Sequence, residues 1–193
     1  KKIRVNVRLL KVEDGSVLWA ENFDERFTSI FSVQDSISSR VATTLSVKLS
    51  DEERTVIEKR YTNNPDAYAL YLRGRYHCYK STEPEIRKGI GFYEQAIKLD
   101  PDYALAYAEM ADAYRTLASA GFAESRTVCP QARSLALRAL ELDESLAEAH
   151  MVLGWIGFLY DWDWKAAERE LLRAIELSPN NSDAHRAYAH FLS

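Results

Sequence analysis

The sequence predicts a mainly α-helical protein, a solenoid of about three and a half helix pairs after a short amino-terminal β-hairpin and helix. Three observations predict this fold class. A pattern of small and large apolar residues recurs along roughly the last two thirds of the chain. Apolar residues recur there at the spacing of one helix face, whereas the first residues alternate between polar and apolar.

The composition excludes several classes of protein. The chain has 193 residues, of which 47% are hydrophobic and 28% charged, as in ordinary globular domains. No run reaches the ~18 apolar residues of a membrane helix, so we expect no membrane contact by this segment. A net charge of −4 argues against nucleic-acid binding by this segment, because that binding depends on basic side chains. Since the chain begins with Lys1, we expect it to be part of a longer protein.

The first residues predict a β-hairpin. Residues 2–12 alternate with the period of a half-buried strand. Asp14-Gly15 predicts a tight turn, because glycine readily adopts positive φ, and residues 17–23 fit the returning strand.

Helices are expected after the hairpin. Apolar residues recur at helical spacing over residues 30–45, and Ser50 with Glu53 predicts a capping box that opens a short helix to about Tyr61. A hairpin is marginal without further strands or a covering helix. We therefore predict that residues 1–62 are the carboxy-terminal part of an α/β domain.

An internal repeat dominates the rest of the chain. Segments 93–101, 136–144 and 171–179 share one pattern, with equivalent alanines at Ala96, Ala139 and Ala174. A second set of small residues precedes them at Gly74, Ala111 and Gly154. Small side chains let two helices pack closely, so these positions predict the contacts within each helix pair.

On these residues the chain resembles the tetratricopeptide repeat (TPR) family, whose helix pairs recur about every 34 residues. The resemblance implies a TPR solenoid over residues 63–193, with repeats at about 66–101, 102–144 and 145–179 and a partial repeat at 180–193. Helix starts are predicted at Asn64, at Thr82 with Glu85 as a capping box, and at Asp163.

A second resemblance concerns the neighbourhood of the repeats. Segments 18–21, 30–35 and 68–74 resemble the junction between a TolB-amino-terminus-like α/β domain and TPRs in large bacterial regulators. In that group the upstream part is usually a winged-helix domain, a nucleotidyl cyclase or a Ser/Thr kinase. The resemblance implies the sensory or regulatory part of a transcription or signalling regulator. The alternative is the regulatory half of an enzyme.

Residues with catalytic potential do not form recognisable motifs. His185 and His190 are five residues apart and lack the spacing of a helical zinc pair, and Gly89-Ile90-Gly91 fits helix packing better than a phosphate loop. We predict a non-enzymatic segment without cofactor or metal. Packing is the favoured interpretation of Trp155, Trp162 and Trp164, and a ligand platform stays open.

The TPR resemblance implies a concave groove lined by the first helix of each pair. Its offsets place eleven residues there: Tyr68, Tyr71, Arg75, Leu105, Asp112, Arg115, Glu148, Met151, Trp155, Asp183 and Arg186. Aromatic and arginine side chains are frequent interface anchors. The expected partner is a protein or peptide, or an effector domain of the same protein.

Two further expectations concern assembly and location. Exposed amino-terminal strands or an open carboxy-terminal repeat could support a homo-oligomer. Two cysteines without a disulfide framework, and the lack of a leader, favour the cytoplasm, although the parent protein could carry a membrane anchor. The Lys/Asn clamp of chaperone-adaptor TPRs is not matched, because the corresponding positions are Tyr71, Arg75, Ala108 and Asp112.

Overall fold

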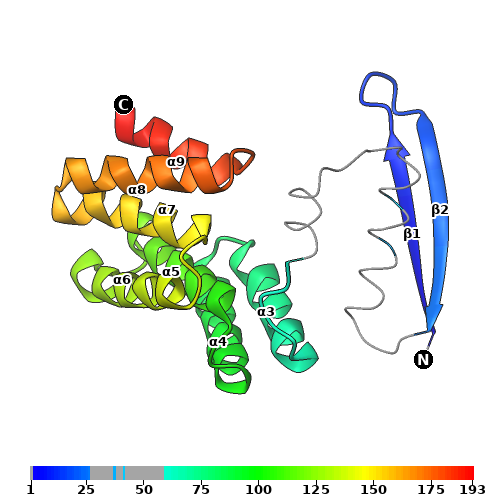
Figure 1. Ribbon diagram of the computed structural model, residues 1–193, viewed down its shortest axis with the longest axis horizontal. Helices are drawn as coiled ribbons and strands as arrows, with labels where there is room; N and C mark the ends of the chain where they lie inside the picture. Colours follow the sequence, from blue (N-terminus) through cyan, green and yellow to red (C-terminus); the bar gives the residue numbers. More distant parts are fainter. Residues whose placement is uncertain (1, 27–36, 38–40, 42–58) are drawn as a thin grey trace. The chain divides into compact units, whose positions relative to one another are not determined.

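The computed structural model describes residues 2–26, 37, 41 and 59–193. The chain divides into two compact units, Lys1–Arg60 and Tyr61–Ser193 (Figure 1). Each unit is described by itself. The helices expected over residues 30–45 and after Ser50 lie outside the described residues, apart from single helical positions at 37 and 41.

The first unit contains the predicted hairpin. Strands β1 (Lys2–Leu10) and β2 (Val17–Arg26) pair antiparallel, with Val5 opposite Phe23. Gly15 has a φ of +69°, and Asp14 accepts a hydrogen bond from the backbone N–H of Ser16 at 2.9 Å. The turn is therefore confirmed.

The second unit is a stack of antiparallel helix pairs (Figure 1). Its elements are α3 (Pro65–Cys78), α4 (Glu83–Leu99), α5 (Ala104–Ser119), α6 (Ser125–Leu142), α7 (Ala147–Ile156), the π-helix η1 (Gly157–Asp161), α8 (Trp164–Leu177) and α9 (Ser182–Leu192). Within each pair the two helices pack on each other, and α5 also contacts α4 and α7. The predicted helix pairs are confirmed.

Small residues set the distance between paired helices. A Cβ atom at Gly74 would lie 2.5 Å from Cε1 of Tyr93, and one at Gly154 would lie 2.5 Å from Cγ of Leu171. Ala111 is completely buried. These are the close approaches that the repeat pattern predicted, since no larger side chain fits without displacing its neighbour.

Of the three helix caps predicted within the second unit, two are confirmed. The Asn64 side chain accepts from the backbone N–H groups of Asp66 and Ala67, and Asp163 accepts from that of Ala166. The capping box at Thr82 is wrong, although α4 does begin at the next residue. The Thr82 side chain makes no capping bond, and the Glu85 carboxylate pairs with other groups.

Those partners of Glu85 explain the difference. Nδ1 of His77 lies 2.7 Å from a Glu85 carboxylate oxygen, and the Lys80 ammonium lies 2.6 Å from the same oxygen. The carboxylate joins α4 to the end of α3 and to the connector, an alternative that the local sequence pattern does not reveal.

The third repeat has an irregular corner. Its first helix continues into the π-helix η1, and Trp162, directly after it, has a φ of +59°. Gly157 permits this geometry against α8, because a Cβ there would lie 3.1 Å from Cβ of Ala167. An ion pair between Arg133 and Asp161 ties the corner to α6.

Candidate binding groove

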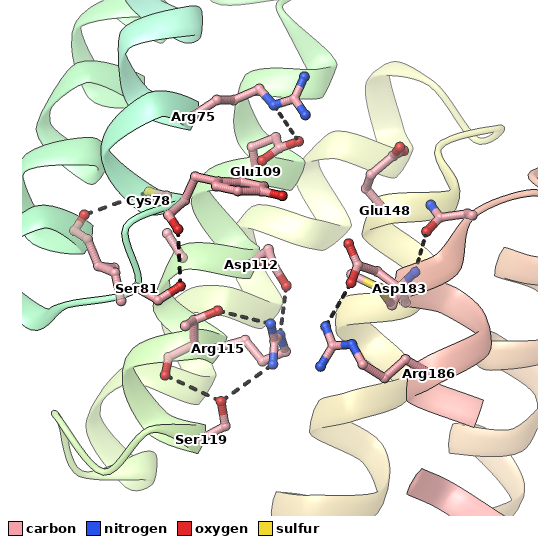
Figure 2. Close-up of a pocket in the computed structure, with 16 residues that line it drawn as sticks. Arg75, Cys78, Ser81, Glu109, Asp112, Arg115, Ser119, Glu148, Asp183 and Arg186 are labelled. Carbon is pink, nitrogen blue, oxygen red and sulfur yellow. Dashed lines mark hydrogen bonds and ion pairs between the residues drawn. The ribbon is translucent and has the colours of Figure 1, made fainter. Parts of the chain in front are cut away.

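The first helices of the repeats enclose a groove of about 690 Å³ (Figure 2). It is lined mainly from α3, α5, α7 and the start of α9, because their equivalent faces point inward. The lining residues are Arg75, Cys78, Tyr79, Ser81, Ile86, Glu109, Asp112, Ala113, Arg115, Thr116, Ser119, Glu148, Met151, Asn181, Asp183 and Arg186. Most of them are polar or charged, so the groove is suited to a polar, extended ligand.

Seven of the eleven residues predicted for the groove lie on its wall. They are Arg75, Asp112, Arg115, Glu148, Met151, Asp183 and Arg186. The offsets of the repeat thus bring together side chains from four helices that are up to 111 positions apart in the chain. Their binding role stays a prediction.

The other four predicted residues do not line the groove. Tyr71 and Trp155 are only 3% and 7% exposed and belong to the hydrophobic core. Tyr68 stacks on Tyr71, with ring centroids 6.2 Å apart, and Leu105 is half-buried against the core. Large apolar side chains at these positions fill the space between neighbouring helices instead of facing solvent.

Glu109 is the central groove residue that sequence reasoning missed. Its side chain is 24% exposed, the hydroxyl of Tyr93 donates to it at 3.3 Å, and Nε of Arg75 lies 3.8 Å away. Burial raises the pKa of Glu109 to about 7; Arg75 opposes this shift, and Asp112 and Glu148 add to it. Its spacing, three residues before Asp112 on the same helix face, was the signal that could have identified it.

Arg115 is held rigidly in the groove wall. Its side chain is only 10% exposed, and Nε donates to Asp112 at 2.7 Å. A second guanidinium nitrogen donates to the hydroxyl of Thr116 at 2.9 Å. The guanidinium also lies 5.2 Å from the ring of Trp155, so Trp155 supports the groove from behind.

The remaining charges lie on α7 and α9. Arg186 and Asp183 form an exposed ion pair of 2.8 Å within α9. Glu148 forms no ion pair within 4.0 Å with any residue in the described part of the chain. The groove therefore contains carboxylates that its arginines do not fully neutralise.

The groove offers little covalent chemistry. Cys78 lies on its wall, and burial raises the pKa of the thiol to about 12, which keeps it protonated and weakly nucleophilic near neutral pH. Within residues 2–26, 37, 41 and 59–193, no three His, Cys, Asp or Glu side chains are grouped so as to hold a metal ion. None of the helices described is long and apolar enough to cross a bilayer.

The tryptophans and histidines have separate surroundings. Trp155 is buried in the core, and the half-exposed ring of Trp164 packs beside Phe191, with centroids 5.9 Å apart. Trp162 is 71% exposed and meets the ring of Trp164 edge-on. Nδ1 of His150 lies 2.7 Å from Glu170, and Nε2 of His185 lies 2.7 Å from the carbonyl oxygen of Pro179. These histidines connect neighbouring helices or turns, as expected for structural residues.

Comparisons with curated proteins give distant relatives. Over 153 residues the chain is 29% identical to putative adenylate cyclase 3 of Rhizobium meliloti (strain 1021), covering 79% of this chain and 26% of that protein. Over 126 residues it is 24% identical to the transcriptional regulator HilA of Salmonella typhimurium, covering 65% and 23%. The chain thus spans about a quarter of the length of these relatives. No family model matches it.

Solved structures identify the fold. The TPR domain of Arabidopsis OM64 has a TM-score of 0.51 and 23% identity, covering 66% of this chain and 94% of that domain. The first TPR of Spaghetti (RPAP3), bound to HSP90 peptide SRMEEVD, has a TM-score of 0.53 and 21% identity, covering 69% and 96%. The Sgt2 TPR domain of Aspergillus fumigatus has a TM-score of 0.54 and 20% identity, covering 69% and 82%. The chain has the TPR fold.

Proposed function

We propose that residues 63–193 form a non-enzymatic interaction scaffold that binds an extended peptide segment of a partner protein in the groove. The observation that carries this proposal is the convergence of side chains from α3, α5, α7 and α9 on one open groove of about 690 Å³. A peptide lying along these helices would contact every repeat at once. Support also comes from the first TPR of Spaghetti (RPAP3), which has the same fold and is bound to a peptide.

The scaffold belongs, in this proposal, to the sensory or regulatory part of a cytoplasmic bacterial transcription or signalling regulator. Similarity to the regulator HilA supports this role. Residues 1–62 would then be the end of a TolB-like α/β domain that connects the scaffold to an upstream effector. The occupant of the groove is either a separate protein or that effector domain.

A second candidate is the regulatory half of a multidomain enzyme. The observation that favours it is the 29% identity to putative adenylate cyclase 3 over 79% of this chain. The groove would serve the same purpose in both cases, and only the effector would differ. The sequence encoded directly upstream distinguishes them: a winged helix supports the regulator, and a cyclase or kinase motif supports the enzyme.

The experiment that tests peptide binding is hydrogen exchange on the 193-residue chain with a peptide selected from a displayed random library. We expect the bound peptide to protect backbone amides of α3, α5, α7 and the start of α9. Protection confined to α4, α6 or α8, or selection of no peptide beyond background, would contradict the proposal.

A further inference from the structure

We propose that the groove selects a peptide with a basic side chain, lysine or arginine, whose charged end lies between Glu109 and Glu148. This inference rests on the proposed function and names the chemical class of its ligand. It depends on which charges in the groove already have partners, and on where the carboxylates stand relative to the open space.

Two of the three groove arginines are already neutralised within their own helices. Arg115 pairs with Asp112 at 2.7 Å on α5, and Arg186 pairs with Asp183 at 2.8 Å on α9. Arg115 is further fixed by Thr116 and by the ring of Trp155. An acidic ligand would have to compete with an existing carboxylate for either guanidinium.

The third arginine, Arg75, does not balance the negative charge of Glu109 and Glu148. Arg75 supplies one positive charge to this part of the groove, whereas Glu109 and Glu148 supply two negative charges when both are ionised. Nε of Arg75 lies 3.8 Å from Glu109, beyond hydrogen-bond distance, and its guanidinium also lies 5.9 Å from the ring of Tyr71. The hydrogen bond that Glu109 receives from Tyr93 is long, at 3.3 Å.

The carboxylates stand on both sides of the open space. Figure 2 shows Glu109 and Asp112 on one side of the groove, facing Glu148 and Asp183 on the other. A cation inserted between α5 and α7 would thus approach carboxylates from two helices at once. The pKa of Glu109 is raised because burial, together with the neighbouring carboxylates Asp112 and Glu148, disfavours its charged form. A basic side chain placed there would stabilise that form.

The nature of the cation follows from the shape of the site. In the described part of the chain, no cluster of three ligating side chains could hold a metal ion. The groove is also long enough to be lined by four helices, so it suits a cation carried on an extended chain. A lysine or arginine supplies the charge, and its apolar stem can lie against Met151 and Ala113 on the groove wall.

The test uses pools of random peptides that differ only in one fixed central residue: lysine, arginine, glutamine or glutamate. The full 193-residue chain is titrated with each pool. We expect the lysine and arginine pools to bind about tenfold or more tightly than the glutamine pool, as a charged hydrogen bond contributes roughly 1.5–3 kcal/mol and each 1.4 kcal/mol is a factor of ten. The glutamate pool should bind weakest.

Variants assign the preference to the named carboxylates. Glu148→Gln and, separately, Glu109→Gln should bring the basic pools close to the glutamine pool. Glu168→Gln, an exposed carboxylate on α8 that does not line the groove, should leave the preference unchanged. Circular dichroism establishes that each variant is folded, and two independent carboxylates guard against one variant failing to fold.

The outcomes separate the two proposals. Equal binding of all pools, or tighter binding of the glutamate pool, would overturn the basic selectivity and leave peptide binding intact. A preference that survives both groove variants would also overturn it. Binding of no pool at all would overturn the proposed function together with this inference.

Discussion

The first and third repeats pack their helix pairs at the same positions but with different chemistry. In the first repeat Gly74 faces the ring of Tyr93, whose hydroxyl reaches Glu109 in the groove. In the third repeat the equivalent Gly154 faces Leu171, which is completely buried and has no polar atom to offer.

The difference explains why the Glu109 carboxylate on α5 has a hydroxyl partner from the core. Behind α5 the core contains the buried tyrosines Tyr71, Tyr93 and Tyr103, which can place a hydroxyl near a half-buried carboxylate. Around α7 the core consists of apolar side chains, among them alanines, Leu171 and Trp155. Among the described residues, Nε1 of Trp155 is the one buried polar side-chain atom that lacks a hydrogen-bond partner. A TPR repeat can therefore keep its packing and still change the polarity it presents to a ligand.

The largest effect is expected from a substitution in the third repeat, whose helix pair packs through apolar side chains. Gly154→Leu places new atoms against Cγ of Leu171, and its Cβ alone would already lie 3.3 Å from the carbonyl oxygen of Ala167. Overpacking of this kind costs about 1–3 kcal/mol of unfolding free energy. Urea denaturation followed by circular dichroism measures it, and an unchanged midpoint would contradict the close packing of α7 on α8.

The next effect is expected at Glu109, the carboxylate that the Tyr93 hydroxyl of the first repeat contacts, and it makes stability depend on pH. The pKa of Glu109 is raised from 4.5 to about 7 in the folded chain, so between these values the folded state holds a proton that the unfolded state has lost. This group therefore lowers stability as pH rises from about 4.5 to 7, a change of about 1–3 kcal/mol. Glu109→Gln should remove this contribution, so the stability difference between wild type and variant changes between pH 5 and pH 8. Parallel pH profiles would contradict it.

Two glycines on α4, two residues apart, test how much close helix packing contributes to stability. A Cβ at Gly89 would lie 2.3 Å from Sγ of Cys78 and 2.9 Å from the backbone oxygen of Gly74, whereas one at Gly91 meets nothing within 4 Å. We expect Gly89→Ala to lose about 1–2 kcal/mol of unfolding free energy. Gly91→Ala, the matched control, should gain up to about 1 kcal/mol from helix propensity. Thermal unfolding that moves both variants in the same direction would refute the distinction.

The smallest expected effect isolates the link between core and groove. Tyr93→Phe removes the hydroxyl that donates to Glu109 at 3.3 Å and keeps the ring against Gly74. The loss should be about 0.5–1.5 kcal/mol, the usual contribution of one hydrogen bond. Tyr114→Phe, at a half-buried position on α5, serves as the control. Equal effects of the two substitutions on denaturation midpoints would mean that the Tyr93 hydroxyl has no special role.

Repeated local patterns made much of the fold predictable. Small residues at Gly74, Ala111 and Gly154 mark helix contacts because packing geometry allows little else there, and Asn64 and Asp163 cap helices through purely local bonds. Contacts between elements are harder to predict, since they depend on where a side chain finally points.

The predictions that were wrong or missing concern residues whose surroundings depend on contacts between elements. Glu85 pairs with His77 and Lys80, so the box with Thr82 does not form. Trp155 turns into the core beneath Arg115 although its position in the repeat suggested the groove. The spacing of Glu109 from Asp112 could have placed it on the same helix face, but its raised pKa comes from burial and neighbouring charges, which depend on contacts between elements.

The most direct test of this account is the pKa of the Glu109 side chain, measured by carbon-detected NMR titration of the carboxyl group in the full chain. A half-buried carboxylate that shares its groove with Asp112 and Glu148 should titrate near pH 7 in the free chain. Saturation with a basic peptide should lower that pKa, because the bound cation stabilises the charged form. An ordinary value near 4.5, unaffected by the peptide, would contradict the proposed groove electrostatics.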